Sequence, residues 1–174
     1  MLWLIYSAMN VSLPMVATWL VLALAQGLIS GGDGAVSWNA DESFDLEVIH
    51  IKMDVHSIKS DMGSIMNNNT YKALKADANP EITFTLTDPV KSIQCKPNEK
   101  TISAKGNLTI AGVTKPVDMQ IKASMQEQSK LAFEGSLAIQ MTDYGIKPPV
   151  ALFGTLKTGN EITITFKTNF LINK

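Results

Sequence analysis

The chain has 174 residues, a length that indicates one domain or one domain with a short appendage, and we take residues 1–174 as a single domain. Of these residues 45% are hydrophobic and 18% charged, which is enough apolar material for a core and an apolar cavity. Its formal net charge is −1 and its fifteen cationic side chains are all lysines, so the charge balance does not favour a nucleic-acid partner, and there is no guanidinium fork to hold a phosphate or carboxylate. The single cysteine, Cys95, cannot form an internal disulfide and indicates neither an oxidising nor a reducing compartment.

The first thirty-one residues are apolar almost throughout and allow three interpretations. A secretory signal would begin with positive charge, but the first cationic residue is Lys52. A transmembrane helix needs about 20 apolar residues, and residues 13–29 fall slightly short of that and have no flanking cation. The third interpretation is two β-strands, roughly residues 2–13 and 17–29.

The next segment predicts a turn and a long strand. Residues 30–34 (Ser-Gly-Gly-Asp-Gly) indicate a turn before a short strand at residues 35–39, and the polar residues 41–43 are a weaker turn candidate. A long strand is expected over residues 44–57. Its apolar positions are first even and then odd: Phe44, Leu46, Val48, then Ile49, Ile51, Met53 and Val55. A change of phase within a strand predicts a β-bulge, because one extra residue exchanges the two faces.

One short helix is expected at about residues 67–77. Residues 67–70 (Asn-Asn-Asn-Thr) offer side chains for the N-cap, residues 71–76 have good helix propensity, and Pro80 ends the helix. A helix of about two turns would serve as a lid or plug rather than as a layer of the fold.

Strict alternation of apolar and polar residues predicts five further strands, each with one buried face: residues 82–87, 102–110, 117–125, 131–141 and 162–170. The turn Ala111-Gly112 joins the second to the third, a polar turn follows at residues 126–130, and residues 142–159 form a loop. With the strand that starts at residue 44, the count is six, and an open sheet of six would leave two exposed edges. Two strands before residue 30 would bring it to eight, the number of a closed barrel that holds side chains or one small ligand. We therefore favour strands for the N-terminal segment.

Three segments carry a family resemblance: YKALKADANPEITFTLT (71–87), GNLTIAGVTKPVDMQIK (106–122) and MTDYGIKPP (141–149). In this order they resemble the YceI-like family of bacterial lipocalin-like proteins, over about residues 44–174. The resemblance implies an all-β fold, an eight-stranded antiparallel lipocalin-like barrel with one short helix. It also implies a lipophilic pocket for a polyisoprenoid or similar amphiphile, and a protein that is periplasmic or secreted. Residues 1–29 depart from the family: the segment SLPMVATW keeps a tryptophan, Trp19, but lacks the family's His and Asp.

The inward-facing side chains form either a filled core or a pocket lining, since eight-stranded barrels can have either. The resemblance favours a pocket, and a lining with methionine would adapt to a flexible chain. The predicted ligand-binding residues are Trp19, Phe84, Leu86, Leu108, Ile110, Val117, Met119, Ile121, Phe133, Leu137, Ile139, Tyr144, Phe166 and Phe170. The segment Asp143-Tyr144-Gly145 is either a contact for the ligand headgroup at the barrel mouth or a turn with Gly145 at positive φ.

Few residues could support catalysis. His50 and His56 lie on one predicted strand, and Asp54 is the only near candidate for a third metal ligand, so outward-facing polar positions are the simpler interpretation. The sequence has no phosphate-binding glycine loop, nucleophile elbow or paired cysteines. We therefore expect neither an enzyme nor a metal or cofactor.

The sequence predicts a carrier or sequestering protein for an isoprenoid-type lipid, such as a polyisoprenoid or an isoprenoid quinone. An alternative is a membrane-associated or self-assembling barrel, in which the apolar residues 1–29 contact a bilayer, pair two copies in a homodimer, or represent a redesigned first hairpin. A third alternative is an enzyme that uses His50 or His56.

Overall fold

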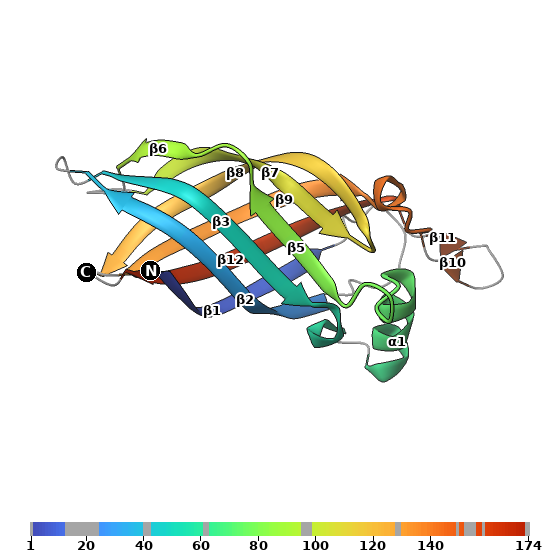
Figure 1. Ribbon diagram of the computed structural model, residues 1–174. Helices are drawn as coiled ribbons and strands as arrows, with labels where there is room; N and C mark the ends of the chain where they lie inside the picture. Colours follow the sequence, from blue (N-terminus) through green and yellow to red (C-terminus); the bar gives the residue numbers. More distant parts are fainter. Residues whose placement is uncertain are drawn as a thin grey trace.

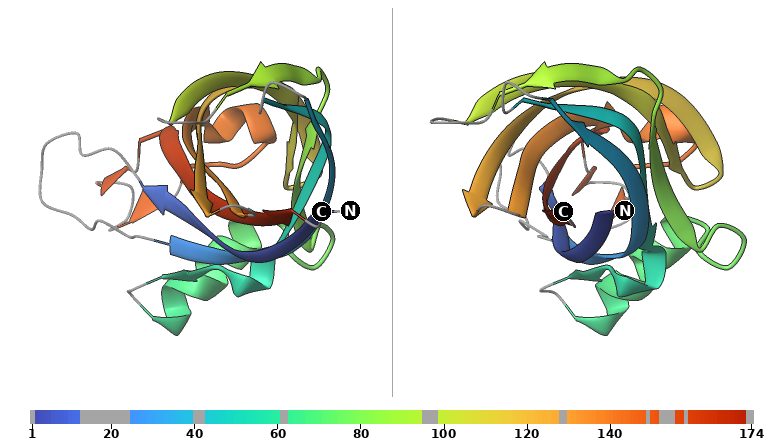
Figure 2. Two further views of the ribbon diagram at one scale, coloured as in Figure 1. Left: turned by 90° about the vertical axis from the view of Figure 1, so that its left-hand side faces the viewer. Right: turned by 60° about the vertical axis from the view of Figure 1, so that its left-hand side comes forward.

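The computed structural model describes residues 2–12, 25–39, 43–60, 63–94, 99–127, 130–148, 150–151, 156–157 and 159–172. In this part of the chain, eight long strands run antiparallel around a barrel (Figure 1; Figure 2): β1 (Leu2–Ser12), β2 (Ala25–Trp38), β3 (Phe44–Asp54), β5 (Glu81–Leu86), β7 (Lys100–Ile110), β8 (Val113–Glu127), β9 (Lys130–Gln140) and β12 (Glu161–Ile172). Their order is β1-β12-β9-β8-β7-β5-β3-β2, and pairing of β2 with β1 closes the ring. The predicted eight-stranded antiparallel barrel is confirmed.

Shorter elements mark the two ends of the barrel. The helical end carries η1 (Val55–Ser57), β4 (Lys59–Ser60), α1 (Ser64–Ala73) and η2 (Met141–Tyr144), with β10 (Val150–Ala151) and β11 (Leu156–Lys157) beyond them. At the opposite end, β1 begins, β12 ends, and β6 (Val90–Ile93) pairs with the start of β3 (Figure 1). We call this the terminal end.

The apolar N-terminal segment forms strands, as predicted, and β1 pairs with β12 along its length. The second strand is described from Ala25 onward, whereas residues 13–24, including Trp19, lie outside the described residues. The side chains of residues 2–31 also lie outside the description. The alternative of a membrane-associated or self-assembling barrel depends on these side chains and therefore stays a prediction. No helix in the described ranges has the length and apolar character required to cross a membrane.

The glycine-rich residues 30–34 lie within β2, so the predicted turn was wrong, and the predicted strand at residues 35–39 is the continuation of β2. The register between β2 and β3 shifts at Ser30, which is the extra residue of a β-bulge. At Gly34 an added Cβ would lie 2.9 Å from Ile49 Cδ1, so this glycine lets the neighbouring strand pack closely. A bulge and a close approach both favour glycine, which gave this strand the composition of a turn.

A second bulge lies in β3, where the phase change predicted one. The register with β2 shifts at Glu47, which is the extra residue. Leu46 and Ile49 are consequently both buried, while Val48 points outward with 48% of its surface exposed. The bulge therefore allows apolar residues of both phases to face the interior.

Helix α1 begins at Ser64, before the predicted start, and its N-cap is Gly63, which makes no side-chain capping hydrogen bond. Residues 67–70, which were expected to cap the helix, lie within it, so this part of the prediction was wrong. The helix ends at Ala73, and turns continue the chain toward β5.

Tyr71 fastens α1 to the barrel. Its Oη lies 2.8 Å from the Ile58 carbonyl oxygen and 2.9 Å from that of His56. Its ring and Leu74 pack against the core at the helical end. No residue within α1 itself is fully buried, and Ile65 is 77% exposed. The helix therefore lies mostly outside the core, beside the rim of the helical end (Figure 2).

The hairpin between β7 and β8 turns at Ala111-Gly112, as predicted. Both residues have positive φ, 50° and 80°, which is the requirement of a type I′ turn between twisted strands. An added Cβ on Gly112 would lie 2.5 Å from Asn79 Oδ1, which is the end of a side chain and can shift, so the positive φ is the main reason for glycine here.

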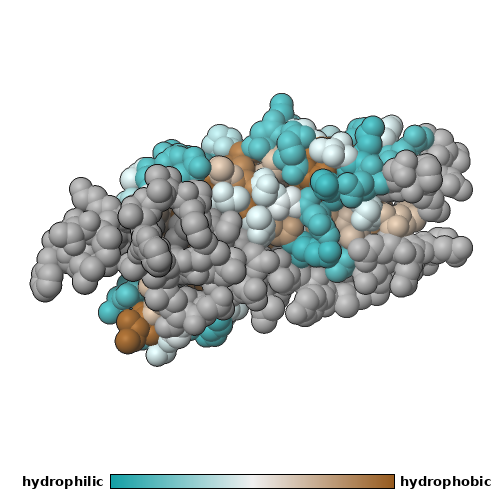
Figure 3. All heavy atoms as spheres, turned by 180° about the vertical axis from the view of Figure 1, so that it is seen from behind, coloured by the Kyte–Doolittle hydropathy of each residue, from teal (hydrophilic) through white to brown (hydrophobic). Residues whose placement is uncertain are grey.

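The core consists of two clusters of buried residues. The terminal-end cluster is Phe44, Leu46, Ile49, Leu86, Ile93, Ile102, Ala104, Met119, Ile121, Ala123, Leu131 and Phe133. The helical-end cluster is Met53, Val55, Ile58, Ala76, Ile82, Leu108, Ile110, Ala111, Ile139, Met141, Tyr144, Ile146 and Ile164. Phe84, Val117 and Leu137 pack against both, so the apolar interior is continuous. Hydrophilic side chains cover much of the described outer surface (Figure 3), as the alternation requires.

Candidate functional site

An apolar cavity of about 90 Å³ lies inside the barrel. Its lining, among the described residues, comes from six strands: Leu46, Ile49, Ile51 and Met53 of β3, Ile82, Phe84 and Leu86 of β5, Ala104 and Leu108 of β7, Met119 and Ile121 of β8, Phe133 and Leu137 of β9, and Ile164, Phe166 and Thr168 of β12. All of these side chains except Thr168 are apolar. The wall therefore offers hydrophobic contact and one hydroxyl group.

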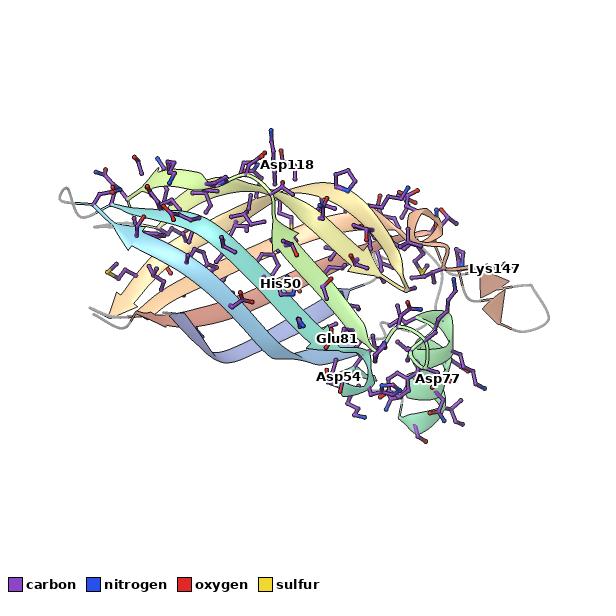
Figure 4. The ribbon with its side chains drawn as sticks, viewed as in Figure 1. His50, Asp54, Asp77, Glu81, Asp118 and Lys147 are labelled. Atoms are coloured by element: carbon purple, nitrogen blue, oxygen red, sulfur yellow. The ribbon has the colours of Figure 1, made fainter. Side chains whose placement is uncertain are left out.

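The register of the strands places these side chains across from one another. Ala104 pairs with Met119, and the next position along each strand carries the outward pair Lys105 and Asp118. Asp118 projects from the outer surface in Figure 4. Since successive residues of a strand point to opposite faces, the alternation in the sequence produces a lipophilic interior and a hydrated exterior from the same strands.

Two aromatic rings in the lining lie across glycines of the neighbouring strand. An added Cβ on Gly106 would collide with the Phe84 ring, and one on Gly135 would lie 2.6 Å from Phe166 Cζ. Each ring thus occupies the space that a side chain on the glycine would need. Because the two rings lie against the wall, they fill less of the barrel centre than rings pointing straight inward would.

Many predicted ligand-binding residues meet at this cavity: Phe84, Leu86, Leu108, Met119, Ile121, Phe133, Leu137 and Phe166. Ile110, Ile139 and Tyr144 instead belong to the helical-end cluster, and Val117 packs against both clusters without lining the cavity. Ile110, Ile139 and Tyr144 face inward but are buried at the helical end, whereas Val117 is only partly buried. Trp19 lies outside the described residues, and only the backbone of Phe170 is described.

Several lining residues were missed from the sequence: Leu46, Ile49, Ile51, Met53, Ile82, Ala104, Ile164 and Thr168. Those of β3 were passed over because the phase change left their inward face undecided. Thr168 was missed because it is polar. It occupies the inward position after Phe166 in the alternation of β12, and that spacing was the signal that could have identified it.

His50 and His56 do not meet. The Nδ1 atom of His50 lies 2.8 Å from Thr85 Oγ1, whereas the His56 backbone N–H donates to Asp54 Oδ1 and its ring centre lies 5.1 Å from that of Tyr71. Figure 4 shows His50 partway along β3 and Asp54 at the end of that strand. In the described ranges no group of three or more His, Cys, Asp or Glu side chains could hold a metal ion.

The segment Asp143-Tyr144-Gly145 forms the end of η2. Gly145 has a φ of 65° and its N–H donates to the Thr142 carbonyl at 3.0 Å, so the predicted turn at positive φ is confirmed, while the headgroup contact stays a prediction. Tyr144 is 2% exposed, and burial, with a smaller contribution from Asp143, raises the pKa of its phenol. The ring closes the helical end of the interior.

A second, open groove of about 470 Å³ runs along α1. Its walls are His56, Asn68, Tyr71, Lys72, Lys75, Ala76, Asp77 and Ala78. Lys59 Nζ lies 3.0 Å from Tyr71 Oη and 5.6 Å from the centre of its ring. The groove has a larger volume than the interior cavity, but it carries lysine side chains and is open to solvent. The interior cavity is therefore the candidate site for an apolar ligand.

The same architecture and sequence pattern occur in known proteins. The family model of the YceI-like domain matches residues 8–170. A UPF0312 protein of Pseudomonas aeruginosa is 35% identical over 79 residues, which are 42% of this chain and 38% of that protein, so the match spans well under half the length of the relative.

Solved structures show the same fold at low identity. A polyisoprenoid binding domain from Saccharophagus degradans is 11% identical over 99% of this chain and 98% of that one, with a TM-score of 0.66. The YCEI protein of Campylobacter jejuni is 15% identical over 92% of both chains, with a TM-score of 0.65. BcnA of Burkholderia cenocepacia is 18% identical over 94% of this chain and 95% of that one, with a TM-score of 0.64.

Proposed function

The chain belongs to the YceI-like family, and on that basis we propose that it binds a long apolar amphiphile in the barrel interior, as a carrier or sequestering protein rather than as a catalyst. The ligand is an isoprenoid-type lipid, a polyisoprenoid or an isoprenoid quinone. The name of the Saccharophagus degradans domain, which is similar in fold, supports this class of ligand. We propose the periplasm or the exterior of the cell as the place of action, because members of the family are exported.

The observation that carries the proposal is the apolar wall of the interior cavity. Its lining continues from the terminal-end cluster to the helical-end cluster without a charged side chain among the described residues. Burial of each CH₂ group of a ligand there would contribute about 0.8 kcal/mol. A chain of several isoprenoid units would therefore bind tightly without any ion pair.

The cavity must widen to accept such a ligand. Its volume of about 90 Å³ is below the roughly 300–1,000 Å³ typical of sites for drug-sized molecules. Met119 is the lining side chain whose rotation would enlarge it most readily, because it is long and unbranched, whereas the Phe84 and Phe166 rings already lie against glycines of the wall. We propose that Met119 moves when the ligand enters.

We propose that the ligand enters at the helical end, beside α1. The helix has no fully buried residue, and its attachment includes the Tyr71 hydroxyl on the carbonyls of η1 and its neighbour Ile58. Elements with few buried contacts open at lower free energy than core strands. We therefore propose that displacement of α1 admits the ligand.

Native mass spectrometry and calorimetry test the proposed function together. Gentle extraction should yield a protein with a co-purified mass of several hundred daltons, on the order of a lipid that fills such a site. Delipidated protein should bind ubiquinone-2 saturably with a stoichiometry of one. A bare polypeptide mass together with no saturable heat from ubiquinone-2 would refute the proposal.

A further inference from the structure

Thr168 is the one polar side chain in the described lining of the cavity, and its hydroxyl is unpaired. The residue is 1% exposed, and Thr168 Oγ1 has no hydrogen-bond partner among the described residues. Buried hydroxyls in folded proteins are nearly always paired, because water that would otherwise bond to them is lost on burial. In the described part of the chain, the other buried side-chain atom without a partner is Asn169 Oδ1, which belongs to the next residue of β12 and hence to the outer face of the strand.

The hydroxyl has a defined position in the cavity. Thr168 pairs with Phe133 of β9, and the Phe133 ring meets Phe44 edge-on, with 6.4 Å between the ring centres. Phe44 and Phe133 both belong to the terminal-end cluster. The Thr168 hydroxyl thus lies toward the terminal end of the cavity, away from α1 and η2.

A valine in this position would have the same shape and no unpaired group. Replacement of a buried, unpaired hydroxyl by a methyl group removes a cost to folding without leaving a hole. A threonine here therefore contributes nothing to folding that a valine would not contribute. What a threonine does provide is a donor and an acceptor for a molecule that enters the cavity.

We propose that Thr168 Oγ1 forms a hydrogen bond with an uncharged oxygen of the ligand, so that the ligand is a long-chain alcohol or quinone inserted oxygen-first toward the terminal end. This inference rests on the proposed function and narrows its ligand class. A plain hydrocarbon would leave the hydroxyl unpaired. A phosphate or carboxylate would bring a charge into a wall whose described residues include no cation, which is far more costly than burial of a neutral oxygen.

The test compares three ligands with the same chain on the wild-type protein and two variants. The ligands are farnesol, farnesyl phosphate and farnesene, measured by equilibrium competition against a fluorescent farnesyl analogue. The wild-type protein should bind farnesol about three- to tenfold more tightly than farnesene, as expected for one neutral hydrogen bond, and farnesyl phosphate most weakly. Thr168→Val should lose that three- to tenfold preference and keep the farnesene affinity, while Thr168→Ser should retain the preference.

Other outcomes separate the two proposals. If the wild-type protein binds none of the three ligands, the proposed function fails and the inference fails with it. If it binds farnesene as tightly as farnesol, or if Thr168→Val weakens both ligands equally, the inference alone fails. The melting temperature of delipidated Thr168→Val supplies an independent reading. It should equal or exceed that of the wild-type protein, and a fall of several degrees would show that the hydroxyl has a structural partner and would overturn the inference.

Discussion

Replacement of Ala104 by leucine tests whether the ligand occupies the interior cavity. Ala104 lines the cavity from β7, is 2% exposed, and pairs with the flexible Met119 of β8. Leucine adds three carbons, which at about 0.8 kcal/mol each would contribute about 2.4 kcal/mol if they enter open apolar space. Ordering the side chain costs about 0.5–1 kcal/mol. The net expectation is a gain of about 1.5 kcal/mol in the free energy of unfolding.

For a chain of this size that gain corresponds to a rise of about 3–6 °C in melting temperature. Calorimetry on delipidated protein measures it, and titration with ubiquinone-2 measures the accompanying loss of affinity, which should be tenfold or more because the leucine occupies ligand space. Thr101→Leu is the matched control, since Thr101 is exposed on the outer face of the same strand, and it should change neither quantity appreciably. A destabilised Ala104→Leu protein with unchanged ubiquinone affinity would show that the ligand does not use this cavity.

Three further predictions concern the walls, the helix and the edge of the barrel. Gly135→Ala should drive the Phe166 ring off the wall, because the new Cβ would lie 2.6 Å from Cζ; we expect a loss of about 1–3 kcal/mol in unfolding free energy, measured by denaturant titration, and weaker ligand binding. Tyr71→Phe should cost about 1 kcal/mol and speed hydrogen exchange in α1 without changing exchange in the barrel strands, and equal acceleration in both would contradict the role of Tyr71 as an anchor. The Ser92 N–H donates to Asp45 at 2.7 Å, and this hydrogen bond, opposed by desolvation and assisted by Asn39 and Lys91, lowers the pKa of the Asp45 carboxyl below its usual 3.8. Because the folded pKa is the lower one, the stabilisation by the Asp45 carboxylate is complete above pH 3.8 and is lost as the pH falls through the folded value. The protection of the Ser92 amide relative to its intrinsic exchange rate should therefore fall at acid pH in the wild-type protein but not in Asp45→Asn.

The sequence predicted best those elements in which one strand face is buried and the other hydrated. The hairpin at Ala111-Gly112 and the bulge at Glu47 both followed from local rules, since a turn needs positive φ and a phase change needs an extra residue. The bulge at Ser30 could not be recognised, because the glycines that follow it are as typical of a turn as of a strand with a close neighbour. The start of α1 was misplaced because its N-cap, Gly63, provides no capping side chain.

The sequence predicted which residues point into the barrel, but not which of them line the cavity. Alternation shows which residues point inward, yet nothing local distinguishes Leu108, which lines the cavity, from Ile110, which is packed under the helical end. That difference depends on η1, η2 and α1, whose placement at that end is set by tertiary contacts. Thr168 shows the converse limit, because residue type alone argued against a position that the spacing supported.

The pairing of β1 with β12 determines when the barrel can be completed. Leu2 lies opposite Ile172, so the first strand of the barrel has its partner in the last one. Until β12 has been synthesised, an apolar strand is without its partner on the growing chain, and such long-range pairing folds slowly and is prone to aggregation. The barrel therefore forms only after synthesis of the whole domain, and a chain that must remain unfolded for some time can be held by a chaperone or passed across a membrane before its ring closes.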